Sequence, residues 1–341
     1  MTLPKLDTRL DRDHQSVERP PEARSAVRPT YVSADDLATA LGYAEAVDAL
    51  DAAFREEDPS AGPVRSHLEI PAGELLLMPA HAARDAGVKL VTIAKGNPER
   101  GLPLIHGVYV LFAPETLVPV AIFDGAALTA LRTAAVSALA TRYLAAPAAR
   151  RLVVFGAGAQ ARAHVHAMRA VRTIDHVTIV GGKSGRAADL VAELTSEGVA
   201  AQLGSAGAVA DADIVCTCTT SSTPVFDAAL VRPGTHVNAI GAYRPDAREL
   251  EPALLSRARV VVETRSSALL EAGDVVLAIE DGALTDGALH ELAPVVRGET
   301  TWSGTEITVF KSVGLALEDL AVAAAAAARL TAARPDDAGR P

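Results

Sequence analysis

Hydrophobic and polar positions alternate in two different rhythms along this chain. Between residues 64 and 125, five short apolar runs are separated by turn residues, a pattern typical of a mostly antiparallel or mixed sheet. Amphipathic helical patterns precede these runs over residues 33–57, where Ser33 is placed to cap the first helix, and follow them over 127–145. The first half therefore predicts an α+β unit.

From Arg151 onward the apolar runs become continuous and alternate with helical patterns. Strands are expected over 151–156, 176–181, 212–218, 236–241, 259–263 and 307–310, and helices over 159–171 and 185–198. Buried strands that alternate with helices are the sign of a parallel, doubly wound sheet. The second half therefore predicts a Rossmann-type α/β unit. A final helix is expected over 312–330, and its periodicity alone does not say which half it packs on.

The composition adds limits to this picture. At 341 residues, of which 49% are hydrophobic, the chain can form two domains with a core in each. Residues 1–30 are rich in Arg, Asp, Glu and Pro, so we expect them to be a flexible leader with no fold of its own. A net charge of −10 argues against nucleic acid or an anionic membrane as the main partner, because both require a concentrated basic surface.

Neither a membrane span nor a metal site is expected. No run is long and apolar enough to cross a bilayer, and the N-terminus lacks the apolar core of a signal peptide. The two cysteines, Cys216 and Cys218, have neither a metal-ligand spacing nor a disulfide framework, which favours buried thiols in a reducing compartment. We therefore predict a cytoplasmic protein without a bound metal.

The turn Gly156-Ala157-Gly158 joins the first buried strand of the second half to a helix. Two glycines permit a tight turn and a close approach of the backbone to a pyrophosphate, and the small Ala161 lets the helix pack close to the strand. This context predicts a dinucleotide site. The next strand ends without the acidic residue that usually holds the ribose of NAD, and Lys183, Ser184 and Arg186 follow it instead. We therefore expect NADP, with NAD as the alternative.

Eight separated blocks share their order and spacing with one known family. They are PVR at 63–65, LMPA at 77–80, KLVT at 89–92, LRTAAVSALA at 131–140, GAGAQA at 156–161, GTHVNAIGAYRPDAREL at 234–250, EAGD at 271–274 and TVFKSVGLALED at 308–319. Through these blocks the chain after Tyr31 resembles the ornithine cyclodeaminase/mu-crystallin family. The resemblance implies an enzyme that acts on the carbon–nitrogen bond of amino acids or their imines with a nicotinamide cofactor.

The resemblance also implies a domain arrangement and a homodimer. Residues 31–147, joined by 312–335, would form the substrate-binding and dimerisation domain, and residues 148–311 would form the Rossmann domain. Arg65, Lys89 and Arg132 match the family's cations that bind the substrate carboxylate. Three cations in one pocket of an acidic protein are costly unless an anion belongs there, which agrees with this assignment. Arg132 is also expected near the start of a helix, where the helix dipole would assist anion binding.

The same matching assigns contacts with the cofactor. These residues are Thr133, Gly156, Gly158, Ala159, Gln160, Thr217, Thr219, Asn238, Lys311 and Ser312. For Thr133 the alternative is a hydroxyl that only satisfies its own helix. The proton donor stays open among three candidates, which are His106, Tyr243 and Asp246.

Two departures separate the chain from true ornithine cyclodeaminases. Tyr243 and Leu76 stand where those enzymes carry carboxylates, and without these acids the second ammonium of ornithine would have no partner. The RPDAREL form instead resembles the mu-crystallin branch, which reduces ketimines. We predict an NAD(P)H-dependent reductase of α-imino acids of the pyrroline- or piperideine-2-carboxylate type, which in reverse would be an amino acid dehydrogenase. The alternatives are an ornithine cyclodeaminase with substitute acids, and a non-enzymatic protein that binds NADPH or a small ligand.

Overall fold

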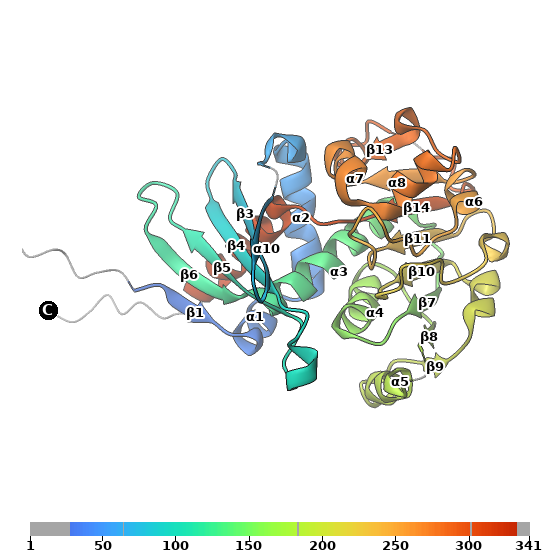
Figure 1. Cartoon of the computed structure of the whole chain (residues 1–341), viewed down its shortest axis with the longest axis horizontal. Coiled ribbons are helices and arrows are strands. Elements are labelled where there is room, and N and C mark those ends of the chain that lie inside the picture. Colours follow the sequence, from blue (N-terminus) through green and yellow to red (C-terminus); the bar gives the residue numbers. More distant parts are fainter. Residues whose placement is uncertain (1–27, 64, 183, 301, 333–341) are drawn as a thin grey trace, which may run out of the picture.

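The structure has two lobes, each built on its own sheet (Figure 1). It is a computed structural model that describes residues 28–63, 65–182, 184–300 and 302–332. The expected leader, residues 1–30, lies almost wholly outside the described residues. Among those described, no helix is long and apolar enough to cross a bilayer.

A six-stranded mixed sheet forms the first lobe. Its strands are β1 (Thr30–Val32), β2 (Ser66–Ile70), β3 (Gly73–His81), β4 (Ala86–Ile93), β5 (Ile105–Phe112) and β6 (Pro119–Asp124), in the order β1-β6-β5-β4-β3-β2. β1 runs parallel to β6, and the other neighbouring strands are antiparallel. Met78, Lys89 and Tyr109 lie opposite one another on β3, β4 and β5, and all three side chains are buried. Lys89 therefore points to the covered face of this sheet.

Four helices belong to the first lobe. They are α1 (Ala34–Ala40), α2 (Tyr43–Glu56), α3 (Gly125–Leu144) and α10 (Ala316–Ala332). Ser33 caps α1, as predicted, through a capping box with Asp36. The last helix, α10, packs on β3, β4 and β5 and against α2 and α3. The C-terminal helix therefore returns to the lobe that the N-terminal half of the chain has built.

Eight parallel strands form the sheet of the second lobe. They are β7 (Arg151–Phe155), β8 (His176–Val180), β9 (Ala201–Leu203), β10 (Ile214–Thr217), β11 (His236–Ala239), β12 (Arg259–Val262), β13 (Leu289–Glu291) and β14 (Thr308–Lys311). Their order is β13-β12-β14-β11-β10-β7-β8-β9. The strand order reverses between β7 and β10. In open α/β sheets, ligands bind at the carboxyl ends of the strands beside such a reversal.

The helices of the second lobe connect these strands. They are α4 (Ala159–Val171), α5 (Arg186–Ser196), α6 (Pro252–Leu255), α7 (Arg265–Glu271), α8 (Gly273–Glu280) and α9 (Leu292–Val296). The predicted class, a Rossmann-type parallel sheet with an α+β partner, is confirmed. The short strands β1, β9 and β13 and the short helices α6 to α9 were not predicted.

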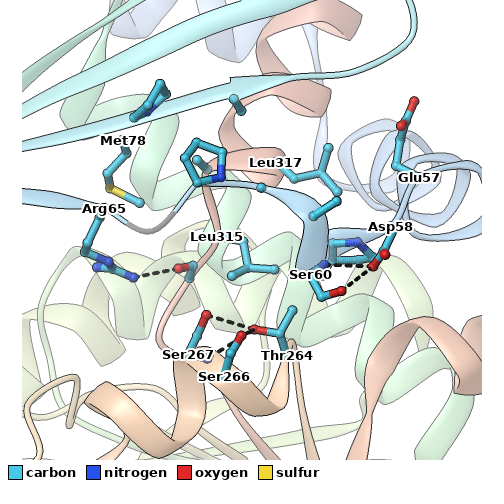
Figure 2. A pocket seen from close by; sticks show the side chains of 18 of the residues that line it. Glu57, Asp58, Ser60, Arg65, Met78, Thr264, Ser266, Ser267, Leu315 and Leu317 are labelled. Atoms are coloured by element: carbon cyan, nitrogen blue, oxygen red, sulfur yellow. Dashed lines mark hydrogen bonds between the residues drawn. The ribbon is translucent and has the colours of Figure 1, made fainter.

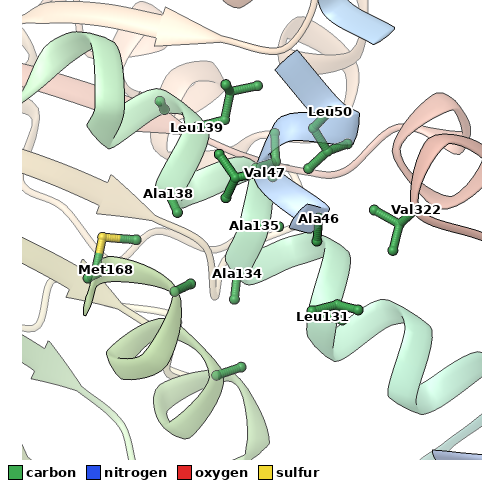
Figure 3. Close-up of a cluster of buried hydrophobic side chains, with 14 of the residues drawn as sticks. Ala46, Val47, Leu50, Leu131, Ala134, Ala135, Ala138, Leu139, Met168 and Val322 are labelled. Carbon is green, nitrogen blue, oxygen red and sulfur yellow. The ribbon is translucent and has the colours of Figure 1, made fainter. Parts of the chain in front are cut away.

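Helix α3 lies between the lobes and is buried along most of its length (Figure 1). Its alanines pack against aliphatic side chains of α2, α4 and α10, among them Val47, Leu50, Met168 and Val322 (Figure 3). Small side chains on α3 let the neighbouring helices approach closely, which suits a chain with only 4% aromatic residues. A residue of α3 is therefore held firmly relative to both lobes.

One local prediction is wrong. Helix α3 begins at Gly125, about two turns before Arg132, and the side chain of Asp124 accepts hydrogen bonds from the first free backbone amides, those of Ala126 and Ala127. Because the field of a helix terminus fades within one turn, the dipole of α3 does not assist anion binding at Arg132.

Candidate active site

The glycine turn follows β7 at the reversal of the strand order. Gly156 has a φ of 113°, and a Cβ atom there would lie 2.5 Å from the carbonyl oxygen of Cys218, at the end of β10. Only glycine therefore allows the two strand ends to approach this closely. Gly158 is the N-cap of α4 without a side-chain cap, and open space surrounds its Cα. Free backbone amides beside open space fit a pyrophosphate.

The residues expected at the adenosine end of a dinucleotide lie at the start of α5. Ser184 and Arg186 are both exposed, and Nε of Arg186 donates to Oγ of Ser184 over 3.3 Å. A shallow cavity of about 300 Å³ runs from Gly158 and Ala159 to Arg186. Lys183, the third residue of this expected set, lies outside the described residues.

The three predicted carboxylate-binding cations come together around the segment that joins β14 to α10. Arg65 donates from Nη2 to the carbonyl oxygens of Val313 and Gly314, over 3.0 and 2.7 Å. Arg132 lies against Gly314, because a Cβ on that glycine would come within 2.3 Å of its Nη1. Lys89 and Arg132 both contact Asp319, in the first turn of α10. Residues from four distant parts of the sequence thus meet at one place.

Four carboxylates face these cations. Glu271 lies 3.0 Å from Nη2 of Arg65, Asp319 lies 2.8 Å from Nζ of Lys89, and Glu318 lies 2.8 Å from Nη1 of Arg132. Glu263 accepts hydrogen bonds from the hydroxyl of Ser312 and the backbone amides of Val313 and Gly314. We call the seven residues the charge cluster: Arg65, Lys89, Arg132, Glu263, Glu271, Glu318 and Asp319.

These carboxylates bear on the expectation that the three cations require an external anion. A trio of cations was expected to require an external anion, but the chain supplies its own counter-charges. None of the four was identified from the sequence. A signal for two was present, since Glu318 and Asp319 are adjacent acids within the apolar helix pattern LALEDLAV.

Burial perturbs the ionisation of the cluster. It lowers the pKa of Lys89 to about 8, with Arg132 acting in the same direction and Asp319 opposing. Burial also raises the pKa of Glu318 to about 8, with Arg132 opposing. For Arg132 burial disfavours the charge, but Asp319 and Glu318 outweigh it and hold the pKa above its usual value. The arginine therefore stays charged, and Glu318 is placed to titrate near neutral pH.

A cavity of about 380 Å³ opens beside the cluster (Figure 2). Arg65, Glu271 and Gly314 form one side, and Arg65 is ion-paired with Glu271 there. Leu315 and Leu317 supply an apolar part of the wall, while hydroxyl groups come from α7 and from the segment after α2. A small organic acid fits this space with room to spare.

The proposed proton donors do not join the cluster. His106 pairs with Thr92 across β4 and β5, three residues from the Lys89–Tyr109 pair, so its exposed side chain points to the opposite face of the sheet. Asp246 is exposed and paired with Arg244, from Nη2 to Oδ2 over 2.6 Å. Tyr243 is 43% exposed. The structure therefore gives no support to His106 or Asp246 as a catalytic acid.

Four side chains assigned to the cofactor have protein partners, and all of them except the half-buried Thr219 are buried. Thr217 and Thr219 donate their hydroxyls to Glu249, whose carboxylate also accepts the backbone amide of Gly241. Nζ of Lys311 lies 2.9 Å from Asp274, and Ser312 donates to Glu263. These side chains fix the loops around the switch point, because buried charges and hydroxyls need such partners. Their placement argues against direct side-chain contact with a cofactor.

Asn238 belongs to a second buried polar group, between α3 and the second sheet. Its Nδ2 donates to Oγ1 of Thr141, and its Oδ1 accepts from Nε2 of His236. Nδ1 of His236 accepts from Thr308. We call the following residues the histidine network: Ser137, Thr141, His164, His236, Asn238 and Thr308.

His164 connects this network to the glycine turn. Its Nδ1 donates to the carbonyl oxygen of Gln160, and its Nε2 contacts the hydroxyl of Ser137. Burial lowers the pKa of His164 to about 4 and that of His236 to about 3, so both are neutral at pH 7. Thr133 is 6% exposed, and its backbone oxygen accepts a hydrogen bond from the hydroxyl of Ser137. The network ties α3 to the dinucleotide turn.

The ornithine cyclodeaminase/mu-crystallin family model matches residues 29–333. The chain belongs to this family. Among its relatives, a delta(1)-pyrroline-2-carboxylate reductase of Bacillus cereus is 37% identical over 73% of this chain and 79% of the relative. The ketimine reductase mu-crystallin of Rattus norvegicus is 34% identical over 86% of this chain and 95% of the relative.

Solved structures of family members share the whole architecture. A Thermococcus litoralis delta(1)-pyrroline-2-carboxylate reductase in complex with NADH and L-proline superposes with a TM-score of 0.84, at 31% identity, over 89% of this chain and 98% of that one. An archaeal alanine dehydrogenase dimer with bound NAD gives a TM-score of 0.82 at 31% identity, over 89% of this chain and 96% of that one. Both superpositions include the two lobes.

Proposed function

We propose that this family member is an NADPH-dependent reductase of small α-imino acids. The observation that carries the proposal is the charge cluster, in which Arg65, Lys89 and Arg132 converge at the junction of the two lobes and Arg65 lines a cavity. Relatives named as pyrroline-2-carboxylate and ketimine reductases support the same chemistry. An anionic substrate group is the ligand that such cations recognise.

In the proposed mechanism, Arg65, Lys89 and Arg132 bind the carboxylate of the substrate. A nicotinamide, when bound, supplies the hydride. The cations fix the carboxylate and thereby the position of the adjacent imine carbon, and they keep that carbon electron-poor. An imine that arrives protonated on nitrogen becomes the neutral amine without a further acid. Much of the catalysis by this chain is then positioning and electrostatic stabilisation.

The side chains around the site favour substrates without a second ammonium group. Leu76 is buried and apolar on β3, and Tyr243 is exposed; these are the positions where cyclodeaminases would need carboxylates. An additional ammonium would therefore be buried without a partner, at a cost of several kcal/mol. This supports cyclic or linear monoamine imino acids over ornithine as substrates.

NADP is the cofactor that we propose, in preference to NAD. No carboxylate follows β8, where Gly181 and Gly182 come directly after Val180, and Arg186 lies nearby with Ser184. A ribose 2′-phosphate fits these groups. Arg186→Ala should raise the KM for NADPH about tenfold and leave that for NADH unchanged. The exposed Arg169 of α4 provides the control, and equal losses with both cofactors after Arg186→Ala would contradict the assignment.

We further propose a homodimer formed through the outer face of the first sheet. Tyr31, Leu68 and Ile70 are 59%, 53% and 41% exposed on this face, and the side chains between them, such as Leu90 and Val110, are only half-buried. A continuous apolar sheet face is unusual on a monomer. The dimer named for the archaeal alanine dehydrogenase agrees with this proposal, and a sedimentation mass of two chains is expected.

We also propose that the protein works in the cytoplasm. The described residues contain two free cysteines, and Cys216 is fully buried in β10. Unpaired buried thiols suit a reducing compartment. Cell fractionation with an antibody to the protein tests this placement.

The function is tested by NADPH consumption with a panel of imines. Pyrroline-2-carboxylate, piperideine-2-carboxylate, and pyruvate with ammonia or methylamine are offered separately, each with and without enzyme. Saturable consumption with at least one imine is expected. Conversion of ornithine to proline and ammonia with catalytic NAD, without turnover of any imine, would establish the cyclodeaminase instead. Tight NADPH binding without turnover of either kind would establish a binding protein.

A further inference from the structure

Two carboxylate oxygens of the charge cluster are buried without a hydrogen-bond partner among the described residues, Oε1 of Glu318 and Oδ2 of Asp319. Oδ2 of Asp319 still lies 2.8 Å from Nζ of Lys89. In Glu318, Oε2 lies 2.8 Å from Nη1 of Arg132, but the buried Oε1 has no hydrogen-bond partner among the described residues. The side chain of Glu318 is fully buried. An ionised carboxylate oxygen left bare in the interior is costly, and a proton on the carboxyl group removes the charge.

The negative charges of the three other carboxylates are offset by more cations or hydrogen-bond donors, or by exposure to solvent. Nζ of Lys89 lies 2.9 and 2.8 Å from the two oxygens of Asp319, and Nε of Arg132 lies 3.2 Å from Oδ1. Glu263 accepts one hydroxyl and two backbone amides. Glu271 is 14% exposed and pairs with Arg65. Glu318 is therefore the member of the cluster that gives up its charge at the lowest cost.

The charges of the cluster leave little room for a further anion. Arg65, Lys89 and Arg132 face four carboxylates, so the cluster already carries one excess negative charge when all seven groups are ionised. A substrate carboxylate would add another. It would also compete with Glu318 for Nη1 of Arg132, since a guanidinium binds a carboxylate best through two N–H groups.

We propose that the substrate carboxylate binds to the form of the protein in which Glu318 is protonated, so that binding takes up one proton wherever Glu318 is ionised beforehand. The inference rests on the proposed function, because it takes Arg132 as a carboxylate-binding group. The proton comes from solvent and bonds to a carboxylate oxygen of Glu318, Nη1 of Arg132 passes to the ligand, and no other bond changes. Release of product reverses both steps. Glu318 thus acts as a resting partner that keeps Arg132 in place and carries no charge while the substrate is bound.

The groups that face Glu318 agree with this role. Arg132 from α3 favours its ionised form, while burial, Glu263 after β12 and the neighbouring Asp319 favour the protonated form and set the pKa at about 8. Transfer of Arg132 to a ligand removes part of the only opposing influence among these causes, so the pKa rises further in the complex. Ligand affinity should therefore fall above pH 8, by up to tenfold per pH unit, because the free protein must first take up a proton.

Lys89 is the other group that could take up the proton. Burial lowers its pKa to about 8, and it faces Arg132 and Arg65 as well as Asp319. Tyr109 of β5, across from Lys89, has a pKa raised by burial and by Asp319, so it stays neutral throughout this range. A decisive test must therefore separate Glu318 from Lys89.

The experiment is a calorimetric titration of the NADPH complex with pyrrole-2-carboxylate, a planar carboxylate that carries no reducible imine. Titrations at one pH in two buffers of different ionisation enthalpy give the number of protons taken up per ligand bound. For the natural sequence we expect uptake to rise from about 0.1 at pH 7 toward about one proton at pH 9. E318Q should bind the ligand with uptake close to zero at every pH.

K89R supplies the matched control, because arginine keeps the positive charge and does not titrate in this range. Uptake should persist in K89R. Uptake that vanishes in K89R and persists in E318Q would assign the proton to Lys89 and overturn the inference, as would the absence of uptake in the natural sequence. Imine reduction by the same preparation separates the two proposals: activity without proton uptake contradicts only the role of Glu318, whereas failure to bind any carboxylate contradicts both.

Discussion

The charge cluster and the histidine network are both buried polar groups at the junction of the lobes, and they are built in opposite ways. The network is neutral: Asn238 bonds both His236 and Thr141, and His164 bonds both Gln160 and Ser137. The cluster is made of acidic and basic side chains, and two of its buried carboxylate oxygens, Oε1 of Glu318 and Oδ2 of Asp319, have no hydrogen bond among the described residues.

This difference indicates what each group does. In the neutral network the donors and acceptors are already paired within the protein, so a ligand would add no hydrogen bond there. The network instead holds α3 against the second sheet. A cluster of paired ions with an incompletely bonded member can exchange one internal partner for an external one. Buried polar groups in the same junction thus divide into a structural part and a part open to substrate.

The largest effect is expected from Arg132→Met, which removes one cation of the cluster at similar volume. The value of kcat/KM for the imine should fall about a hundredfold or more, because a buried charge partner is lost. The Kd for NADPH, read from cofactor fluorescence, should change by less than about twofold. Arg329→Met removes an exposed ion pair with Glu45 and serves as control. Equal losses for NADPH and imine would show that Arg132 does not serve the substrate alone.

A change in the network should act on stability instead. Asn238→Leu leaves His236 and Thr141 without their amide partner in a buried site, so the free energy of unfolding should fall by about 2–3 kcal/mol. Urea unfolding measures this loss. At a temperature where the variant is folded, the KM for the imine should stay nearly unchanged. A KM that rises as much as in Arg132→Met would contradict the division into a structural network and a substrate-binding cluster.

The network should also make stability depend on pH with a definite sign. The pKa of His236 is lowered to about 3 by burial, against about 6.5 in an unfolded chain, so its contribution is present above pH 6.5 and is lost as the pH falls toward 3. Between its unfolded pKa and pH 8, Glu318 makes the unfolding free energy fall as the pH rises, which is the opposite sign. The contribution of His236 must therefore be isolated by comparison with a variant.

His236→Gln should therefore reduce the slope of unfolding free energy against pH relative to the natural sequence, by an amount that grows from pH 6.5 to about 1.4 kcal/mol per pH unit near pH 5. Urea midpoints at several pH values give this slope. The exposed His106, changed to Gln, is the control and should leave it unaltered. Identical slopes for all three proteins would mean that His236 is not held neutral by the fold.

The smallest effect is expected from Gly314→Ala. Gly314 has a φ of 81°, and a new Cβ would meet Nη1 of Arg132 at 2.3 Å, so the guanidinium must move. KM for the imine should rise about tenfold. Gly282→Ala is the matched control, since its φ is 72° and nothing lies within 4 Å of the added atom. If the two variants raise KM alike, backbone strain and not the contact with Arg132 is responsible.

Much of the fold could be predicted from the sequence because the periodicities are long and clear. The runs from Arg151 to Val171 and from His176 to Ser196 give strands and helices within a residue or two of their observed bounds. Strands of three residues, such as β9 and β13, carry too few positions to show a period. The start of α3 was misjudged because Asp124, its cap, ends an apolar strand run.

The site could be predicted only in part. The cations Arg65, Lys89 and Arg132 were found through family blocks, and the glycine turn through its chemistry. Their counter-charges were missed because ion pairing across two hundred residues, as between Lys89 and Asp319, leaves no local pattern. Asn238 and Lys311 were assigned to the cofactor through the family resemblance. A polar residue at a strand end gives no sign by itself of whether its partner is a ligand or the protein.

The most direct measurement is a crystal structure of the protein with NADPH and L-proline. The account predicts that the carboxylate of proline lies within hydrogen-bond distance of Arg65, Lys89 and Arg132, with its α-carbon against the nicotinamide ring. A proline carboxylate bound away from these three side chains, with the charge cluster unchanged, would contradict it.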